Sequence, residues 1–125
     1  MSIIAIIAVV LQVLLGLGFV MAGGMKLMGT KQSLQQRDHL KIASWFWTFT
    51  GAVEIIEAIG LIVGIWLPFV AVLAGLLVLA TMIGAAYAHV RNKDSFQHIV
   101  SPIIFFVLAL IVVILRFPEV TRLLA

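Results

Sequence analysis

The sequence predicts an all-α integral membrane protein, a bundle of four transmembrane helices that forms a single domain over residues 1–125. Composition is the first reason, because 64% of the residues are hydrophobic and 10% are charged, whereas a soluble domain carries about 25% charged residues. The second reason is that four apolar segments reach about 20 residues, the length at which a helix crosses a bilayer.

The predicted transmembrane helices cover about residues 3–28, 45–67, 69–90 and 97–117. The first lacks an early basic residue and is too long for the apolar core of a signal peptide, so we expect it to be retained. Almost no connector separates the second and third helices at Pro68, which predicts a tight hairpin. The last helix tolerates Pro102 near its start, and an interfacial tail that contains Arg116 and Arg122 is expected to follow it.

The polar segment 29–44 predicts a loop that passes into an interfacial helical turn. Trp45, Phe46 and Trp47 come next, where an aromatic belt would mark the bilayer boundary. Anchors at that boundary are the favoured interpretation, and a stacking platform for a ring-shaped ligand is the alternative.

The distribution of basic residues predicts the orientation in the membrane. The positive-inside rule places loops 29–44 and 91–96 in the cytoplasm and both termini outside. Two basic residues are expected outside, Arg116 and Arg122, and six are expected at the cytoplasmic side: Lys26, Lys31, Arg37, Lys41, Arg91 and Lys93.

The second helix carries two carboxylates, Glu54 and Glu57. An ionised acid at the centre of a membrane costs about 2.5–3.5 kcal/mol, so such residues usually face the bundle interior and mark function. Three residues of helix place the two acids roughly 60° apart, and Glu57 lies beside the groove that Gly60 and Gly64 leave. We therefore expect both acids to face other helices. The run from Gly60 to Gly64 is also compatible with a homodimer, although packing within the bundle explains it equally well.

Five polar residues are expected to converge in the cytoplasmic half of the bundle: Lys26, Glu54, Glu57, His89 and His98. We expect Lys26 to form an ion pair with Glu54. We also expect Glu54 and Glu57 to share a proton. The hypothesis is proton transfer by Glu54 together with Glu57, and ligand binding by Lys26, Glu54 and His89. The alternative is structural: the ion pair only fixes helix register, Lys26 snorkels, and a backbone carbonyl holds His89.

Other chemistry is disfavoured. The chain has no cysteine, which excludes disulfides and thiolate ligands. No residues show the spacing of a metal site, a phosphate loop or a catalytic triad, and a haem held by His89 and His98 would need ligands from one short turn. The net charge of +3 comes mostly from loops, which indicates orientation and contact with lipid, not nucleic acid.

Short motifs along nearly the whole chain resemble the DoxX-like membrane proteins: residues 23–27 (GGMKL), 51–54 (GAVE), 58–61 (AIGL), 84–89 (GAAYAH) and Pro102. The resemblance implies a four-helix fold in the bacterial plasma membrane. It implies that the protein acts as a small subunit of a quinone-coupled or thiol-coupled oxidoreductase complex. It also implies that Lys26, Glu54 and His89 occupy the recurring polar positions. Glu57 departs from the pattern, because the family commonly has a small residue there.

These observations favour a small subunit of a membrane redox system that binds a quinone-like molecule against Lys26, Glu54 and His89. No redox cofactor can be read in the chain, so electrons would come from a redox partner protein or a bound substrate. A non-enzymatic assembly factor or scaffold is the first alternative. A proton-coupled small carrier is the second, although four helices are few for alternating access unless a homodimer forms. Whether the protein is an enzyme stays open.

Overall fold

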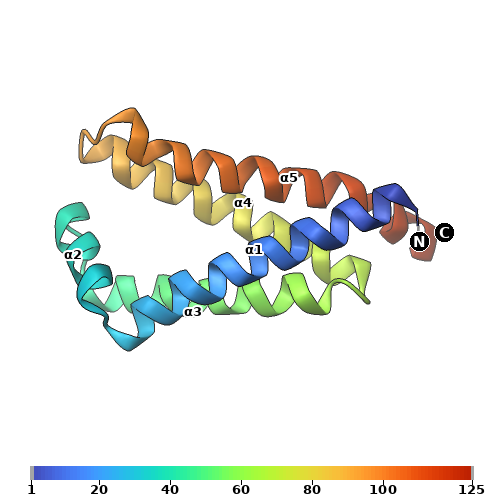
Figure 1. The fold of residues 1–125 in the computed structure, drawn as a ribbon, viewed down its shortest axis with the longest axis horizontal. Coiled ribbons are helices and arrows are strands. Elements are labelled where there is room, and N and C mark those ends of the chain that lie inside the picture. Colours follow the sequence, from blue (N-terminus) through green and yellow to red (C-terminus); the bar gives the residue numbers. More distant parts are fainter. Residues whose placement is uncertain (1, 125) are drawn as a thin grey trace.

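The computed structural model describes residues 2–124 (Figure 1). Five helices make up this part of the chain: α1 (Ile3–Met28), α2 (Lys31–Leu40), α3 (Ser44–Val63), α4 (Pro68–Arg91) and α5 (Phe96–Leu124). Four of them, all but α2, are long and apolar enough to cross a membrane. The prediction of an all-α membrane bundle is confirmed.

The spanning helices form two pairs. Helix α1 packs along α3, α4 packs along α5, and contacts between α3 and α4 join the pairs. Figure 1 shows both chain termini at one end, here called the terminal end, and α2 with the α4–α5 turn at the other, the loop end. Eight buried apolar residues from all four spanning helices form the core: Leu15, Phe19, Ala58, Leu61, Ala74, Val78, Ala109 and Val112.

Helix α2 corrects the prediction of a loop that passes into a helical turn over residues 29–44. Gly29 ends α1 in the left-handed conformation (φ 67°), which glycine adopts without strain. The side chain of Thr30 then accepts a hydrogen bond from the Ser33 backbone N–H at 3.2 Å. This N-cap satisfies a free donor and starts a helix of 10 residues.

The last helix extends beyond its predicted end near residue 117, because α5 continues through Pro118 to Leu124. Arg116 is buried, and its side chain bonds to Gln12 and Glu119. The bond to Gln12 holds the last turns of α5 against α1. A proline inside a membrane helix is tolerated where neighbouring groups satisfy the freed backbone. At the hairpin, α3 ends at Val63, before the predicted boundary at residue 67.

Glycines permit the closest approaches between helices. A Cβ at Gly23 would lie 2.7 Å from the Gly51 carbonyl oxygen, so α1 and α3 cross here almost backbone to backbone. A Cβ at Gly60 would meet Ala74, and one at Gly64 would meet Ala71, at 2.9 and 2.6 Å. The groove beside Glu57 is therefore filled by α4 of the same chain.

Candidate functional site

The crossing of α1 and α3 brings Lys26 to Glu54. Both side chains are largely removed from solvent, with 17% and 8% exposure. The Lys26 ammonium donates to Glu54 Oε1 and forms an ion pair with it. A charge in an apolar span needs such a partner, and the predicted pairing of these two residues is confirmed.

Trp47 completes this cluster. The Lys26 ammonium lies 4.6 Å from the centre of the Trp47 ring, which is within the range of a cation–π interaction. The Trp47 indole N–H donates to Ser33 Oγ of α2 at 2.9 Å, and the residue is 4% exposed. Trp47 is therefore not an interface anchor as predicted, whereas Trp45 is 73% exposed. The missed signal was helical phase, because Trp47 precedes Glu54 by seven residues on the same face.

Glu57 is fully buried and faces α4. The Thr81 hydroxyl lies 3.2 and 3.1 Å from its two carboxylate oxygens and can donate to either. No hydrogen bond joins Glu57 to Glu54 among residues 2–124. Both acids thus face other helices, as predicted, and each has its own partner.

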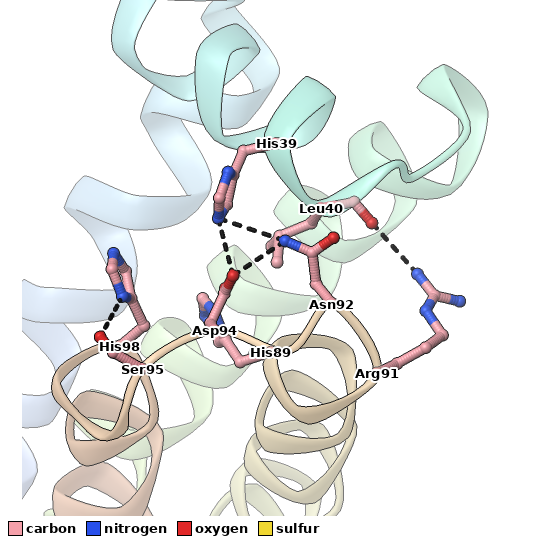
Figure 2. A network of polar contacts seen from close by, with 8 residues as sticks. All are labelled: His39, Leu40, His89, Arg91, Asn92, Asp94, Ser95 and His98. Carbon is pink, nitrogen blue, oxygen red and sulfur yellow. Dashed lines mark hydrogen bonds and ion pairs between the residues drawn. The ribbon is translucent and has the colours of Figure 1, made fainter.

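His89 lies in a separate network at the loop end, drawn in Figure 2. Its Nδ1 is 2.6 Å from Asp94 Oδ2, and the other oxygen of Asp94 is 2.9 Å from His39 Nε2. The Asn92 amide donates to Asp94 Oδ1 at 2.8 Å. Since His39 comes from α2, and Arg91 also donates to the Leu40 carbonyl at 3.1 Å, this network ties α2 to the α4–α5 turn.

The charge of Asp94 is favoured by this network. The hydrogen bond from His89 is the main cause that lowers the pKa of Asp94 to about 2. Desolvation raises this pKa, and hydrogen bonds from Asn92 and His39 lower it further. The prediction that a backbone carbonyl holds His89 is wrong, because a carboxylate does so.

His98 lies beside this network rather than in it. Its Nδ1 is 3.1 Å from Ser95 Oγ, and its ring centre is 6.0 Å from those of His39 and His89. Within residues 2–124, no group of three or more His, Asp or Glu side chains is arranged to hold a metal ion.

An apolar groove of about 230 Å³ separates parts of α4 and α5. It is lined by Met82, Ile83, Ala86, Pro102, Ile103 and Phe106. Ala86 precedes His89 by three residues and Pro102 follows His98 by four, so the groove lies about one helical turn from the histidines.

Comparison with known proteins identifies the family. A sequence profile of the DoxX-like family matches residues 10–112. The chain belongs to the DoxX-like family. It is 35% identical over 79 residues to a protein of Bacillus subtilis (strain 168) described as Uncharacterized protein YdgD, and the match covers 62% of this chain and 69% of that protein. No solved structure matches.

The DoxX-like chain is thus a multi-pass membrane protein whose predicted site residues fall in two places. Lys26 and Glu54 meet, with Glu57 one turn along α3, whereas His89 bonds to Asp94. Among the described residues, no hydrogen bond or ion pair joins His89 to Lys26 or Glu54. Sequence reasoning missed Ser33, His39 and Asp94, and it favoured Trp47 as an interface anchor over a platform for a ring-shaped ligand. Nothing in the sequence points from His39 to Asp94, which are 55 residues apart.

Proposed function

We propose that this DoxX-like protein is a small subunit of a membrane redox system and binds a lipophilic, quinone-like molecule beside Lys26 and Glu54. The observation that carries the proposal is the Lys26–Glu54 ion pair, held inside spanning helices next to the Trp47 ring. Buried ionisable residues in a membrane usually serve function rather than stability.

The residues of this cluster can perform the acid–base part of quinone chemistry. A lysine ammonium has three donors, so Lys26 can bond a ring carbonyl while it keeps Glu54. Reduction of a quinone to a quinol takes up two electrons and two protons. The electrons would come from a partner protein. Glu54 would take up a proton from water and pass it to the oxygen that Lys26 orients, and the second proton would go to the other ring oxygen. Glu57 supplies a second carboxyl group on the same face of α3.

Only one ring nitrogen of His89 is free to contact a ligand. Nδ1 already bonds to Asp94, and Nε2 makes no hydrogen bond within residues 2–124. His89 could therefore contact the ligand only through Nε2.

Native mass spectrometry with lipid extraction tests the proposal. The wild-type protein, purified in mild detergent, is compared with Glu54→Gln, which is nearly isosteric, and with the surface control Asp38→Asn, whose side chain is 72% exposed. We expect a small lipophile to be retained by the wild type and the control and lost from Glu54→Gln. Bulk lipid alone in all three samples would contradict ligand binding and leave the ion pair a structural role.

An assembly factor or scaffold is the second candidate, and one observation favours it. A Cβ at Gly84 would have no atom within 4 Å, so α4 presents an open, small-residue position on its outer surface. If this is the function, Gly84→Leu should abolish co-purification with a larger membrane complex, and Glu54→Gln should not. The opposite pattern would exclude docking at Gly84.

A further inference from the structure

The terminal end holds a pocket of about 250 Å³ between the first turns of α1 and the last turns of α5. Figure 1 shows these two helix ends side by side. Three charged residues of α5 line the pocket, Arg116, Glu119 and Arg122, and their formal charges sum to +1. The pocket lies at the opposite end from α2, so it is separate from the site proposed above.

Two groups hold the Arg116 side chain in place, one on α1 and one on α5 itself. Its Nε donates to Gln12 Oε1 at 2.9 Å, and the Gln12 amide in turn donates to the Leu61 carbonyl of α3 at 2.8 Å. Its Nη1 donates to Glu119 Oε2 at 2.8 Å. The Arg116 side chain, which is 6% exposed, is therefore fixed in place before any ligand arrives.

One edge of the Arg116 guanidinium remains available. Its Nη2 has no acceptor among residues 2–124, yet no buried side-chain nitrogen in this part of the chain lacks a partner. Nη2 must therefore be accessible, and the pocket that Arg116 lines is where a ligand can reach it. A guanidinium offers five N–H donors, of which the bonds to Gln12 and Glu119 use two.

The other residues that line the pocket indicate what a ligand carries besides an anionic group. Both helices contribute apolar lining, and Ser2 adds a hydroxyl; the apolar residues are Ile4, Ala5 and Ala8 of α1 and Leu115 and Pro118 of α5. Two arginines beside an apolar lining near the ends of spanning helices suit a lipid phosphate, because a guanidinium matches phosphate oxygens. A free anion would gain nothing from the apolar walls.

We propose that this pocket binds the phosphate of an acidic phospholipid, with Arg116 and Arg122 against the head group and the acyl chains along the apolar lining. Glu119 is already paired with Arg116, which reduces its repulsion of the phosphate. Nothing in this inference depends on quinone binding.

Titration of the full-length protein in detergent, followed by native mass spectrometry, tests the assignment. The probes are dioleoyl-phosphatidylglycerol and dioleoyl-phosphatidylcholine, which share acyl chains and differ in net charge. Arg122→Gln is the test variant because Arg122 is exposed, so the substitution leaves the buried contacts of Arg116 intact. Arg37→Gln, at the loop end, is the matched control.

We expect wild type and Arg37→Gln to prefer phosphatidylglycerol, and Arg122→Gln to lose about fivefold of that affinity, the effect of one basic residue at an anionic surface. Equal binding of the two lipids by wild type, or equal losses in both variants, would overturn the proposal. Displacement of phosphatidylglycerol by inorganic phosphate alone would assign the pocket to a free anion and also overturn it.

Discussion

At the scale of single residues, Lys26 and Glu54 stabilise each other in a place where neither charge is tolerated alone. Removing one partner of a buried pair costs about 3–5 kcal/mol. Because Lys26 keeps 17% exposure, we expect Lys26→Gln to lower the free energy of unfolding by about 3 kcal/mol, the lower end of that range. The double variant Lys26→Gln/Glu54→Gln should lose less than the two single variants together. Unfolding in mixed detergent micelles measures all three.

The surface pair of Arg37 and Asp38, at 3.1 Å, provides the control for this cycle, because Asp38 is 72% exposed. Substituting either residue should change the free energy of unfolding by less than about 1 kcal/mol. Additive losses for Lys26 and Glu54 would show that the buried ion pair does not couple the two helices.

Asp94 predicts a pH dependence of stability. Its pKa in the folded protein, about 2, lies below the ordinary value of 3.8, chiefly because of the hydrogen bond to His89. The folded protein therefore binds this proton less readily than the unfolded chain. The carboxylate stabilises the fold above about pH 4, and that stabilisation is lost as the pH falls toward about 2.

Thermal unfolding of Asp94→Asn checks this pH dependence. We expect the variant to melt below wild type at pH 7 and the difference between them to shrink as the pH falls from about 4 to about 2. Asp38→Asn, at a side chain that is 72% exposed, is the control. A difference that stays constant over this range would mean that the charge of Asp94 does not matter.

At the scale of elements, the crossing of α1 and α3 depends on Gly23. A Cβ there would lie 2.7 Å from the Gly51 carbonyl oxygen, whereas one at Gly24 would meet nothing within 4 Å. Gly23→Ala should therefore destabilise the protein by about 1–3 kcal/mol, as overpacking does. Gly24→Ala should be neutral or stabilising by about 0.5–1 kcal/mol, because alanine favours helix. Similar effects of the two substitutions, measured by unfolding, would contradict a close crossing at Gly23.

The sequence predicted the spanning helices because hydropathy over some 20 residues is a strong signal. It missed α2 because a polar helix of 10 residues shows no apolar stripe, and its start depends on the Thr30 cap. It placed the end of α5 too early because Arg116 resembles a residue at the membrane boundary. Only the three-dimensional contact with Gln12, 104 residues away, shows that Arg116 is buried.

At the scale of the whole molecule, contacts between residues far apart in the sequence also limited the prediction of the site. Burial of Glu54 and Glu57 could be predicted because charge in a membrane is costly, and Lys26 was a suitable partner for Glu54. The division into two clusters could not be predicted. The loop end is joined by a contact between His39 and Asp94, and neither helical phase nor composition relates residues that far apart in the chain.

The orientation in the membrane remains a prediction for the whole chain. Six of the eight basic residues lie toward the loop end, so the positive-inside rule places that end in the cytoplasm. The chain has no cysteine, so a maleimide can react only with a cysteine that is introduced by substitution. A membrane-impermeant maleimide should label Thr121→Cys in intact cells and Lys93→Cys only after permeabilisation. The reverse pattern would invert the topology.

Trp47 can report directly on whether the Lys26–Glu54 cluster binds a lipophilic ligand, because its ring centre lies 4.6 Å from the Lys26 ammonium. Trp45 and Trp66 are each 73% exposed, so replacing both with phenylalanine leaves Trp47 as the only tryptophan at little cost in packing. A short-chain benzoquinone is then titrated while Trp47 fluorescence is followed. We expect saturable quenching that weakens when Glu54→Gln is added. Quenching that rises linearly with quinone concentration, and equally in both proteins, would show that no ligand binds beside Lys26 and Glu54.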